Sequence, residues 1–190
     1  MPPKIRFQKE DIITAAVDVV RADGLDSLNA RAIAAKLGCS TQPLYRDLRN
    51  MEEIREAVVT RAQQHYQDYV THNTIVSISP YKSAGLAFLR FANDEKELFK
   101  LLFMRERSDS QQGMESDPIY PYVLEQITQA TPLTYEQART FHLHMSIYSH
   151  GLGVMIATNY LKFNEDELSD ALSVQFQSLK LYLASDHQSN

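Results

Sequence analysis

The 190-residue chain has one cysteine, Cys39, no tryptophan, six glycines and seven prolines. A single cysteine excludes an intramolecular disulfide and a zinc site built from several cysteines. The remaining composition, 44% hydrophobic and 23% charged, is that of a globular protein and not of a low-complexity chain. No apolar run approaches the roughly 20 residues that cross a bilayer, and the N-terminus lacks the apolar segment of a signal peptide. We therefore expect a soluble, cytoplasmic protein with no membrane partner.

Common catalytic and cofactor motifs are also missing from the sequence. We find no nucleotide-binding glycine motif, no H-E-x-x-H and no G-x-S-x-G. His142 and His144 would point about 200° apart on a helix, so one helix cannot bring both to one metal ion. We expect no enzyme activity, no cofactor and no metal site. A helical enzyme that uses the Tyr- and His-rich second half is the alternative.

Charge is unevenly distributed along the chain. The net charge of −5 argues at first against a nucleic-acid partner. Residues 1–50, however, carry a net charge of +2, residues 51–107 are neutral, and residues 108–190 carry −7. A mildly basic N-terminal part on an acidic body is compatible with a DNA-binding end joined to a second functional part.

Helical periodicity dominates the sequence, and strand-like alternation is scarce. Gly24 and Gly38 can end the first two helices. Ser, Thr, Asn or Asp precedes most apolar runs, often with Glu or Gln three residues later, as in capping boxes that begin at Asn50, Asp94, Thr134 and Asn164. The sequence predicts an all-α fold of about nine helices, near residues 8–23, 30–37, 40–47, 51–72, 81–92, 95–105, 119–130, 135–159 and 165–184.

Residues 29–47 have helix-turn-helix spacing. Asn29 can cap one helix, a tight turn passes through Gly38, and Ser40 can cap a second, short helix. Thr41 and Gln42 in the first turn of that helix have hydroxyl and amide groups that can read base edges in a major groove. The candidates for phosphate contacts are Tyr45, Arg46 and Arg49, because hydroxyl and guanidinium groups can donate hydrogen bonds to phosphate oxygens. The spacing alone also fits an ordinary helical hairpin.

Residues 12–58 resemble the N-terminal DNA-binding domain of TetR-family transcriptional regulators. The matching residues are Ile13-x-x-Ala16, Gly24, Ile33-Ala34, Leu37-Gly38-Cys39-Ser40, Leu44-Tyr45 and Asn50-Met51-Glu52-Glu53-Ile54. Residues 91–103 and His150-Gly151 also resemble a subtype named for a Trp-His-Gly motif, although this chain has no Trp. The resemblance implies a helix-turn-helix domain at residues 1–49 and a helical effector-binding and dimerisation domain at 50–190.

The resemblance implies a homodimer that binds a palindromic double-stranded DNA operator and is released, as a repressor, by an unknown small-molecule effector. A regulator of the same fold without a small effector is the alternative. The DNA-binding candidates are Lys4, Arg6, Asn29, Arg31, Ser40, Thr41, Gln42, Tyr45, Arg46 and Arg49.

Two further groups of residues are candidates in the body. The effector-pocket candidates are Tyr66, Phe88, Phe91, Phe103, Phe141, Met145, Tyr148 and His150, for which core packing is the alternative. A stripe of small residues predicts a dimer interface, for which packing within the chain is the alternative. The interface candidates are Ser149, Gly153 and Ala157 on one helix and Ala171, Gln175 and Ser178 on the last helix.

Overall fold

The computed structural model describes residues 7–46, 48–106, 113–117 and 119–185, and these residues contain helices and no strands. The chain divides into two compact units. One comprises residues 1–68 and 95–105, and the other comprises 69–94 and 106–190. The two units share the helix α3 (Met51–His72), which has residues in both. The functional division between residues 49 and 50 that the sequence predicts is a different boundary and stays a proposal.

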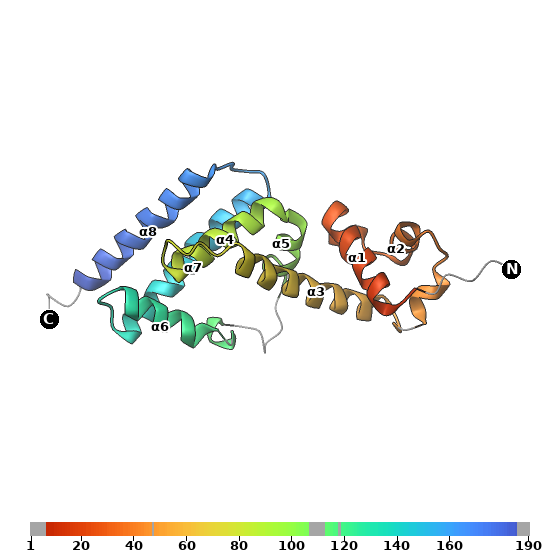
Figure 1. Cartoon of the computed structure of the whole chain (residues 1–190), viewed down its shortest axis with the longest axis horizontal. Helices are drawn as coiled ribbons and strands as arrows, with labels where there is room; N and C mark the ends of the chain where they lie inside the picture. Colours follow the sequence, from red (N-terminus) through yellow and green to blue (C-terminus); the bar gives the residue numbers. More distant parts are fainter. Residues whose placement is uncertain (1–6, 47, 107–112, 118, 186–190) are drawn as a thin grey trace. The chain divides into compact units, whose positions relative to one another are not determined.

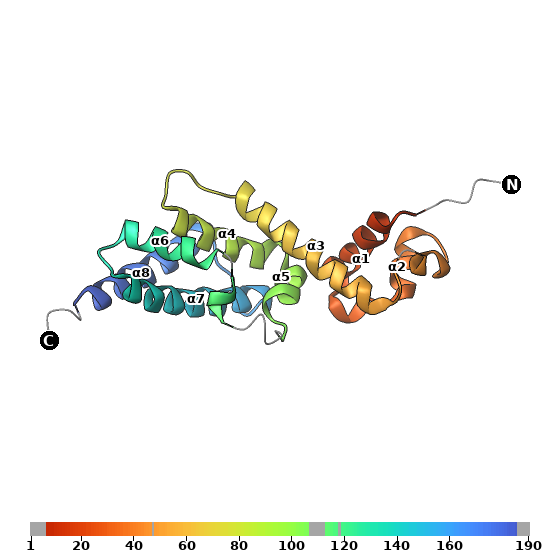
Figure 2. The same cartoon turned by 90° about the horizontal axis from the view of Figure 1, so that it is seen from below.

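The first unit is built on α1 (Lys9–Asp23), against which α2 (Ala30–Leu37) and α5 (Lys96–Phe103) pack. The 3-10 segment η1 (Leu25–Ser27) lies between α1 and α2, and η2 (Gln42–Tyr45) lies between α2 and α3; Figure 2 shows the path of the chain through these helices. The buried side chains include Ile12, Ala16, Val20, Ile33, Leu44, Leu48, Ile54, Val58, Leu98 and Phe99. This core fixes the helix pair that the sequence predicts for DNA.

The second unit is a bundle in which α7 (Tyr135–Ala157) packs against three other helices. These are α4 (Pro80–Asp94), α6 (Tyr120–Ala130) and α8 (Glu165–Ser185), and a short η4 (Met114–Ser116) precedes α6 (Figure 1). The buried side chains include Leu86, Leu89, Phe91, Leu124, Ile127, Phe141, Leu168 and Leu172. In the described part of the chain no helix is long and apolar enough to cross a membrane.

Most of the predicted helix ends are confirmed. Asn29 caps α2, and Gly38 follows that helix in the left-handed conformation, with φ 66° and ψ 34°. Thr134 and Gln137 form the predicted capping box of α7. At α8 the Asn164 side chain accepts from the Glu167 N–H, and the Glu167 carboxylate accepts from the Asn164 N–H.

Two predictions about the helices are wrong. The described residues form eight α-helices, and the third predicted helix, 40–47, is only the 3-10 segment η2. Asp94 does not cap the helix after it, because α5 begins after Glu95 without a side-chain cap. The Asp94 carboxylate instead accepts a hydrogen bond from the Tyr69 hydroxyl, at 2.5 Å.

Candidate nucleic-acid interface

Asn29 caps the start of α2, the first helix of the predicted helix-turn-helix. The Asn29 Oδ1 accepts from the N–H groups of Arg31 at 3.1 Å and Ala32 at 3.0 Å, and the Asn29 Nδ2 donates to the Ser27 carbonyl. The Cys39 N–H donates to the Ala34 carbonyl at 3.0 Å, which closes the turn at the other end of α2. Asn29, a predicted DNA residue, therefore has a structural role in the chain itself.

The predicted recognition segment is a short 3-10 turn. Pro43 stands in its first turn, where a helix leaves the N–H without an intrahelical partner, so the proline fits this position and does not by itself explain why no α-helix forms. The Leu44 N–H donates to the Thr41 carbonyl at 3.2 Å, and the Arg46 N–H donates to the Pro43 carbonyl at 3.3 Å. Leu44 is fully buried and anchors this turn. Thr41, and not Ser40, precedes the segment, and it makes no side-chain cap.

The turn brings the central DNA candidates together on the surface. Gln42, Tyr45 and Arg46 are exposed, Tyr45 by 42%, while Thr41 is half-buried. The remaining described candidates, Arg31, Ser40 and Arg49, are exposed too. Lys4 and Arg6 lie outside the described residues. The arrangement leaves amide, phenol and guanidinium groups accessible on one projecting turn, and their contacts with DNA stay a prediction.

Arg46 has a contact that sequence reasoning did not foresee. Its Nη2 donates to the carbonyl oxygen of Phe7 at 3.2 Å. This bond joins η2 to the residue that follows the basic segment with Lys4 and Arg6. A guanidinium has five N–H donors, so Arg46 can hold this carbonyl and still donate to a phosphate oxygen.

The start of α3 closes the recognition turn on its other side. The Asn50 Oδ1 accepts from the Glu53 N–H at 2.9 Å, which confirms the first half of the predicted capping box. The Glu53 carboxylate accepts from the N–H of Arg49, at 2.7 Å, instead of from that of Asn50. These two bonds fix the backbone of Arg49 next to η2.

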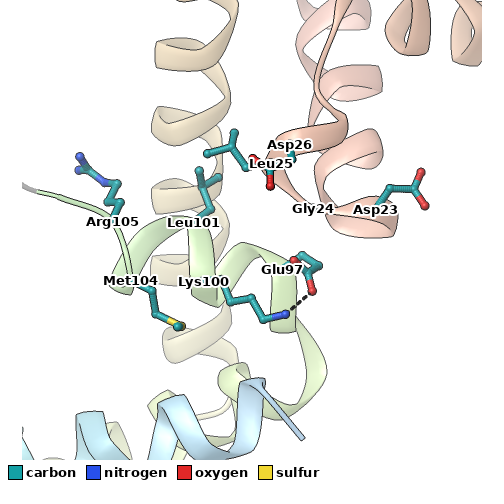
Figure 3. A pocket seen from close by; sticks show the side chains of 9 residues that line it. All are labelled: Asp23, Gly24, Leu25, Asp26, Glu97, Lys100, Leu101, Met104 and Arg105. Atoms are coloured by element: carbon teal, nitrogen blue, oxygen red, sulfur yellow. Dashed lines mark hydrogen bonds and ion pairs between the residues drawn. The ribbon is translucent and has the colours of Figure 1, made fainter.

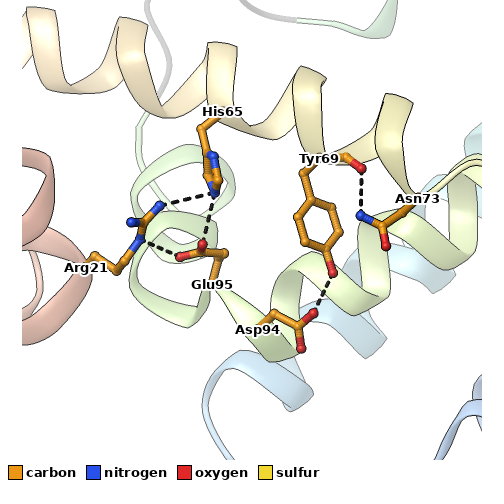
Figure 4. A network of polar contacts seen from close by, with 6 residues as sticks. All are labelled: Arg21, His65, Tyr69, Asn73, Asp94 and Glu95. Atoms are coloured by element: carbon orange, nitrogen blue, oxygen red, sulfur yellow. Dashed lines mark hydrogen bonds and ion pairs between the residues drawn. The ribbon is translucent and has the colours of Figure 1, made fainter. Parts of the chain in front are cut away.

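A polar cluster that the sequence did not predict holds three elements of the first unit together (Figure 4). The Arg21 Nε of α1 donates to Glu95 Oε2 at 2.8 Å. The His65 Nε2 of α3 lies 2.9 Å from Glu95 Oε1 and 3.2 Å from Arg21 Nη2. The three residues are 30 to 74 positions apart in sequence, so no local pattern could reveal the cluster. It restrains α1 against α3.

A second polar contact lies in the other unit. Burial and the hydrogen bond to Asp94 raise the pKa of the Tyr69 hydroxyl above its usual value. Figure 4 also shows the Asn73 amide donating to the Tyr69 carbonyl, at 2.9 Å. The last turn of α3 is thereby joined to the end of α4 through Tyr69 and Asp94.

The predicted effector-pocket residues are divided between the two units. Tyr66 and Phe103 belong to the first unit, where their rings lie 5.1 Å apart, and the other six belong to the second. Phe91 and Phe141 are fully buried. They match the core-packing alternative. The half-buried members in the second unit are Phe88, Tyr148 and His150, and the rings of Phe88 and His150 lie 6.0 Å apart.

A half-buried polar pair lies among aromatic side chains of the second unit. The Tyr81 hydroxyl lies 3.1 Å from His142 Nδ1, and the rings of Phe141 and Phe176 lie 4.9 Å apart beside Tyr81. Burial raises the pKa of Tyr81 and lowers that of His142, and the charge of Asp117 opposes the second shift. The sequence showed the aromatic content but not which rings would meet.

The predicted dimer stripe is partly inside the chain. Gly153 and Ala157 are buried in the single chain, which is the intrachain packing that the sequence left as the alternative. Ser149, Ala171 and Gln175 are half-buried, and Ser178 is exposed. The exposed large apolar side chains on the same two helices are Leu143, Ile147 and Met155 of α7 and Val174, Leu181 and Tyr182 of α8.

No protein-family model matches the chain. The chain is 23% identical over 113 residues to the tetracycline repressor protein class D of Escherichia coli. These residues make up 60% of this chain and 47% of that protein. It is 34% identical over 62 residues to the HTH-type transcriptional repressor DrrR1 of Streptomyces coeruleorubidus, 33% of this chain and 23% of that protein. The chain thus spans about half the length, or less, of these curated relatives.

Solved structures match over most of the chain. A TetR-like transcriptional regulator from Rhodococcus sp. RHA1 has a TM-score of 0.64 at 18% identity, covering 94% of this chain and 98% of that one. The multidrug binding protein EbrR, solved with imidazole, has a TM-score of 0.54 at 14% identity, with 87% and 88% covered. The sequence and structure matches confirm the predicted resemblance: part of the chain is similar in sequence to tetracycline repressors, and the chain has the all-helical fold of TetR-like regulators.

Proposed function

We propose that the chain is a sequence-specific DNA-binding transcriptional regulator and that it acts as a repressor. The observation that carries the proposal is the exposed turn η2, which presents Gln42, Tyr45 and Arg46 on a buried Leu44 anchor. The similarity to named transcriptional repressors supports this assignment. A short turn that projects from a helical core is a shape that can enter a major groove.

Within this proposal the residues have different roles. Gln42, with Thr41, reads base edges, because an amide can donate to and accept from one base at the same time. The phosphate-binding residues are Tyr45, Arg46 and Arg49, together with Lys4 and Arg6 of the basic segment. Asn29 acts through its cap, which fixes the start of α2 after η1. The net charge of +2 over residues 1–50 supports a modest electrostatic contribution.

We infer that the chain forms a homodimer through α7 and α8. Leu143, Ile147 and Met155 recur at multiples of four residues, with the exposed Gly151 between them, which makes one apolar face of α7. On α8, Val174 and Leu181 are 66% and 67% exposed and seven residues apart. Exposed apolar stripes on two adjacent helices are typical of an interface between subunits. We propose this exposed face as the dimer interface, in place of the buried stripe through Gly153 and Ala157.

A small-molecule effector that releases DNA is the remaining part of the proposal. The half-buried Phe88, Tyr148 and His150 are the accessible members of the predicted pocket. EbrR, a multidrug binding protein of the same fold, was solved with imidazole, which supports a small ligand for a protein of this fold. The −7 charge of residues 108–190 favours a neutral or cationic effector. Helix α3 has residues in both units, so it is the element through which an effector would change DNA affinity.

The test is selection of binding sites from a pool of random DNA duplexes by the full chain. We expect an enriched palindromic site whose two halves lie about one helical turn apart, roughly 34–36 Å, because a symmetric dimer reads two half-sites. A matched selection with the variant Gln42→Ala is the control for the reading turn. Recovery of no common sequence by the wild-type chain would contradict the proposal.

A further inference from the structure

Several basic side chains of the first unit are paired with acidic side chains. Figure 3 shows one pair at the cleft between the end of α1 and α5, where Lys100 Nζ donates to Glu97 Oε1 at 2.6 Å. Further pairs in this unit are Arg21–Glu95, Lys36–Asp18, Arg55–Glu52 and Arg61–Glu10. An acidic partner offsets part of each positive charge, so these side chains attract a DNA phosphate less strongly than an unpaired cation does.

Lys9, at the start of α1, has no such partner. It is exposed and makes no ion pair with any residue that the structure describes. Its two acidic neighbours along the chain are engaged elsewhere, because Glu10 pairs with Arg61 of α3 and Asp11 Oδ2 accepts from the Gln8 N–H at 2.8 Å. The same state is found for two residues that are already proposed DNA contacts, Arg31 and Arg49.

Arg46 brings a second cation to the start of α1. Its Nη2 donates to the carbonyl oxygen of Phe7 at 3.2 Å, although the two residues are 39 positions apart in sequence. Phe7 and Lys9 are two residues apart, so their Cα atoms lie at most about 7 Å from each other. The Arg46 guanidinium and the Lys9 ammonium therefore belong to one small region of the surface, and both residues are exposed.

The bond to Phe7 also restrains how the guanidinium is turned. A guanidinium is planar and has five N–H donors, so one N–H bound to the carbonyl leaves the others directed away from it. Those donors match the geometry of phosphate oxygens. Gln42 and Tyr45 lie on the same turn as Arg46, so a phosphate bound here would belong to the DNA backbone beside the bases that η2 reads.

We propose that Lys9 and Arg46 together bind one phosphate of the DNA backbone, and that the bond from Arg46 to the Phe7 carbonyl holds the two cations beside each other. This inference rests on the proposed function, to which it adds Lys9 as a DNA contact and Arg46 as a positioning residue. Phosphate contacts carry no base preference of their own, so this pair fixes the placement of η2 on the duplex and leaves the reading of bases to Gln42.

The first test compares affinities of the full chain for the selected DNA site and for a scrambled duplex at several salt concentrations. Lys9→Gln should weaken both duplexes alike, about threefold in low salt, and this loss should shrink as the salt concentration rises. The matched control, Lys162→Gln, removes an equal charge at an exposed position of the second unit and should leave both affinities unchanged.

A double-mutant cycle tests the positioning role. Arg46→Ala already releases the start of α1, so adding Lys9→Gln to it should weaken DNA binding no further. Adding Lys9→Gln to Arg49→Ala should still cost about threefold, because no bond that the structure describes joins Arg49 to the start of α1.

The bond itself can be tested without DNA. In the free chain the heteronuclear NOE of the Phe7 and Gln8 amides reports their mobility on the ps–ns timescale. Arg46→Ala should lower this NOE, because it removes the bond to the Phe7 carbonyl, whereas Arg49→Ala should leave it unchanged.

Each measurement has a result that would overturn the proposal. These results are a Lys9→Gln chain with full DNA affinity, a full threefold loss when Lys9→Gln is added to Arg46→Ala, and an unchanged Phe7 NOE in Arg46→Ala. A wild-type chain that binds both duplexes equally would contradict the proposed function alone, since the phosphate contact is still decided by the same variants on either duplex. A chain that binds neither duplex would overturn both proposals.

Discussion

Removal of the Asn29 side chain should destabilise α2 without changing any buried residue. The Asn29 Oδ1 accepts two backbone N–H bonds, from Arg31 and Ala32, and it is exposed, so water can partly replace it in the variant. Replacement of an N-cap Asn by Ala costs typically about 1 kcal/mol. In a chain of this size that loss lowers the melting temperature by about 2–4 °C. Thermal unfolding of Asn29→Ala followed by circular dichroism measures it.

Asn29→Ser is the matched variant, because a serine hydroxyl also caps a helix but has no amide to donate. We expect its melting temperature to match the wild type within about 1 °C, since Ser and Asn are similar caps. Its DNA affinity should also match, because the cap and not the amide positions the turn. An Asn29→Ala protein as stable as the wild type would refute the capping argument. A stable Asn29→Ser protein with weakened DNA binding would show that the amide contacts DNA.

Three further outcomes follow from the structure. Arg46→Ala should weaken specific and non-specific DNA binding alike and lower the salt slope by about 1, measured by anisotropy titrations at several salt concentrations; an unchanged slope would exclude a phosphate contact. Ile147→Glu should give monomers in sedimentation, whereas Leu161→Glu, an exposed apolar control outside α7 and α8, should stay dimeric. The pKa of His142 is lowered by burial, so the unfolded chain binds more protons just below its usual value of 6.5. Stability to urea should therefore fall as pH drops below about 6.5, and His142→Gln should remove part of that fall; an identical pH profile in the variant would contradict it.

Local signals in the sequence were enough to place most helices. Asn29, Gly38 and Thr134 act on backbone groups within a few residues, so their roles can be recognised without the rest of the fold. The third predicted helix is only a 3-10 turn, and no local signal separates the two structures, because Pro43 in the first turn is compatible with both. Asp94 failed as a cap because a distant partner, the Tyr69 hydroxyl, binds its carboxylate.

The faces of the helices could not be read from the sequence. The stripe through Gly153 is small and regular, but only the packing of α7 decides that it faces inward and that Ile147 faces outward. The separation of Tyr66 from Phe88 into two units likewise depends on tertiary contacts. The Arg21–His65–Glu95 cluster is made by segments far apart in sequence, so no motif predicted it.

The most direct test of the proposed function is the ratio of affinities for the selected DNA site and for a scrambled duplex, measured with the full chain at one fixed salt concentration. The account predicts a large ratio for the wild type. For Gln42→Ala it predicts a smaller ratio, which corresponds to a loss of about 1–3 kcal/mol in the free energy of discrimination, because one bidentate base contact contributes that much. Affinity for the scrambled duplex should be the same in both proteins. A wild-type chain that binds both duplexes equally, or a Gln42→Ala variant with an unchanged ratio, would contradict the assignment of η2 as the turn that reads DNA sequence.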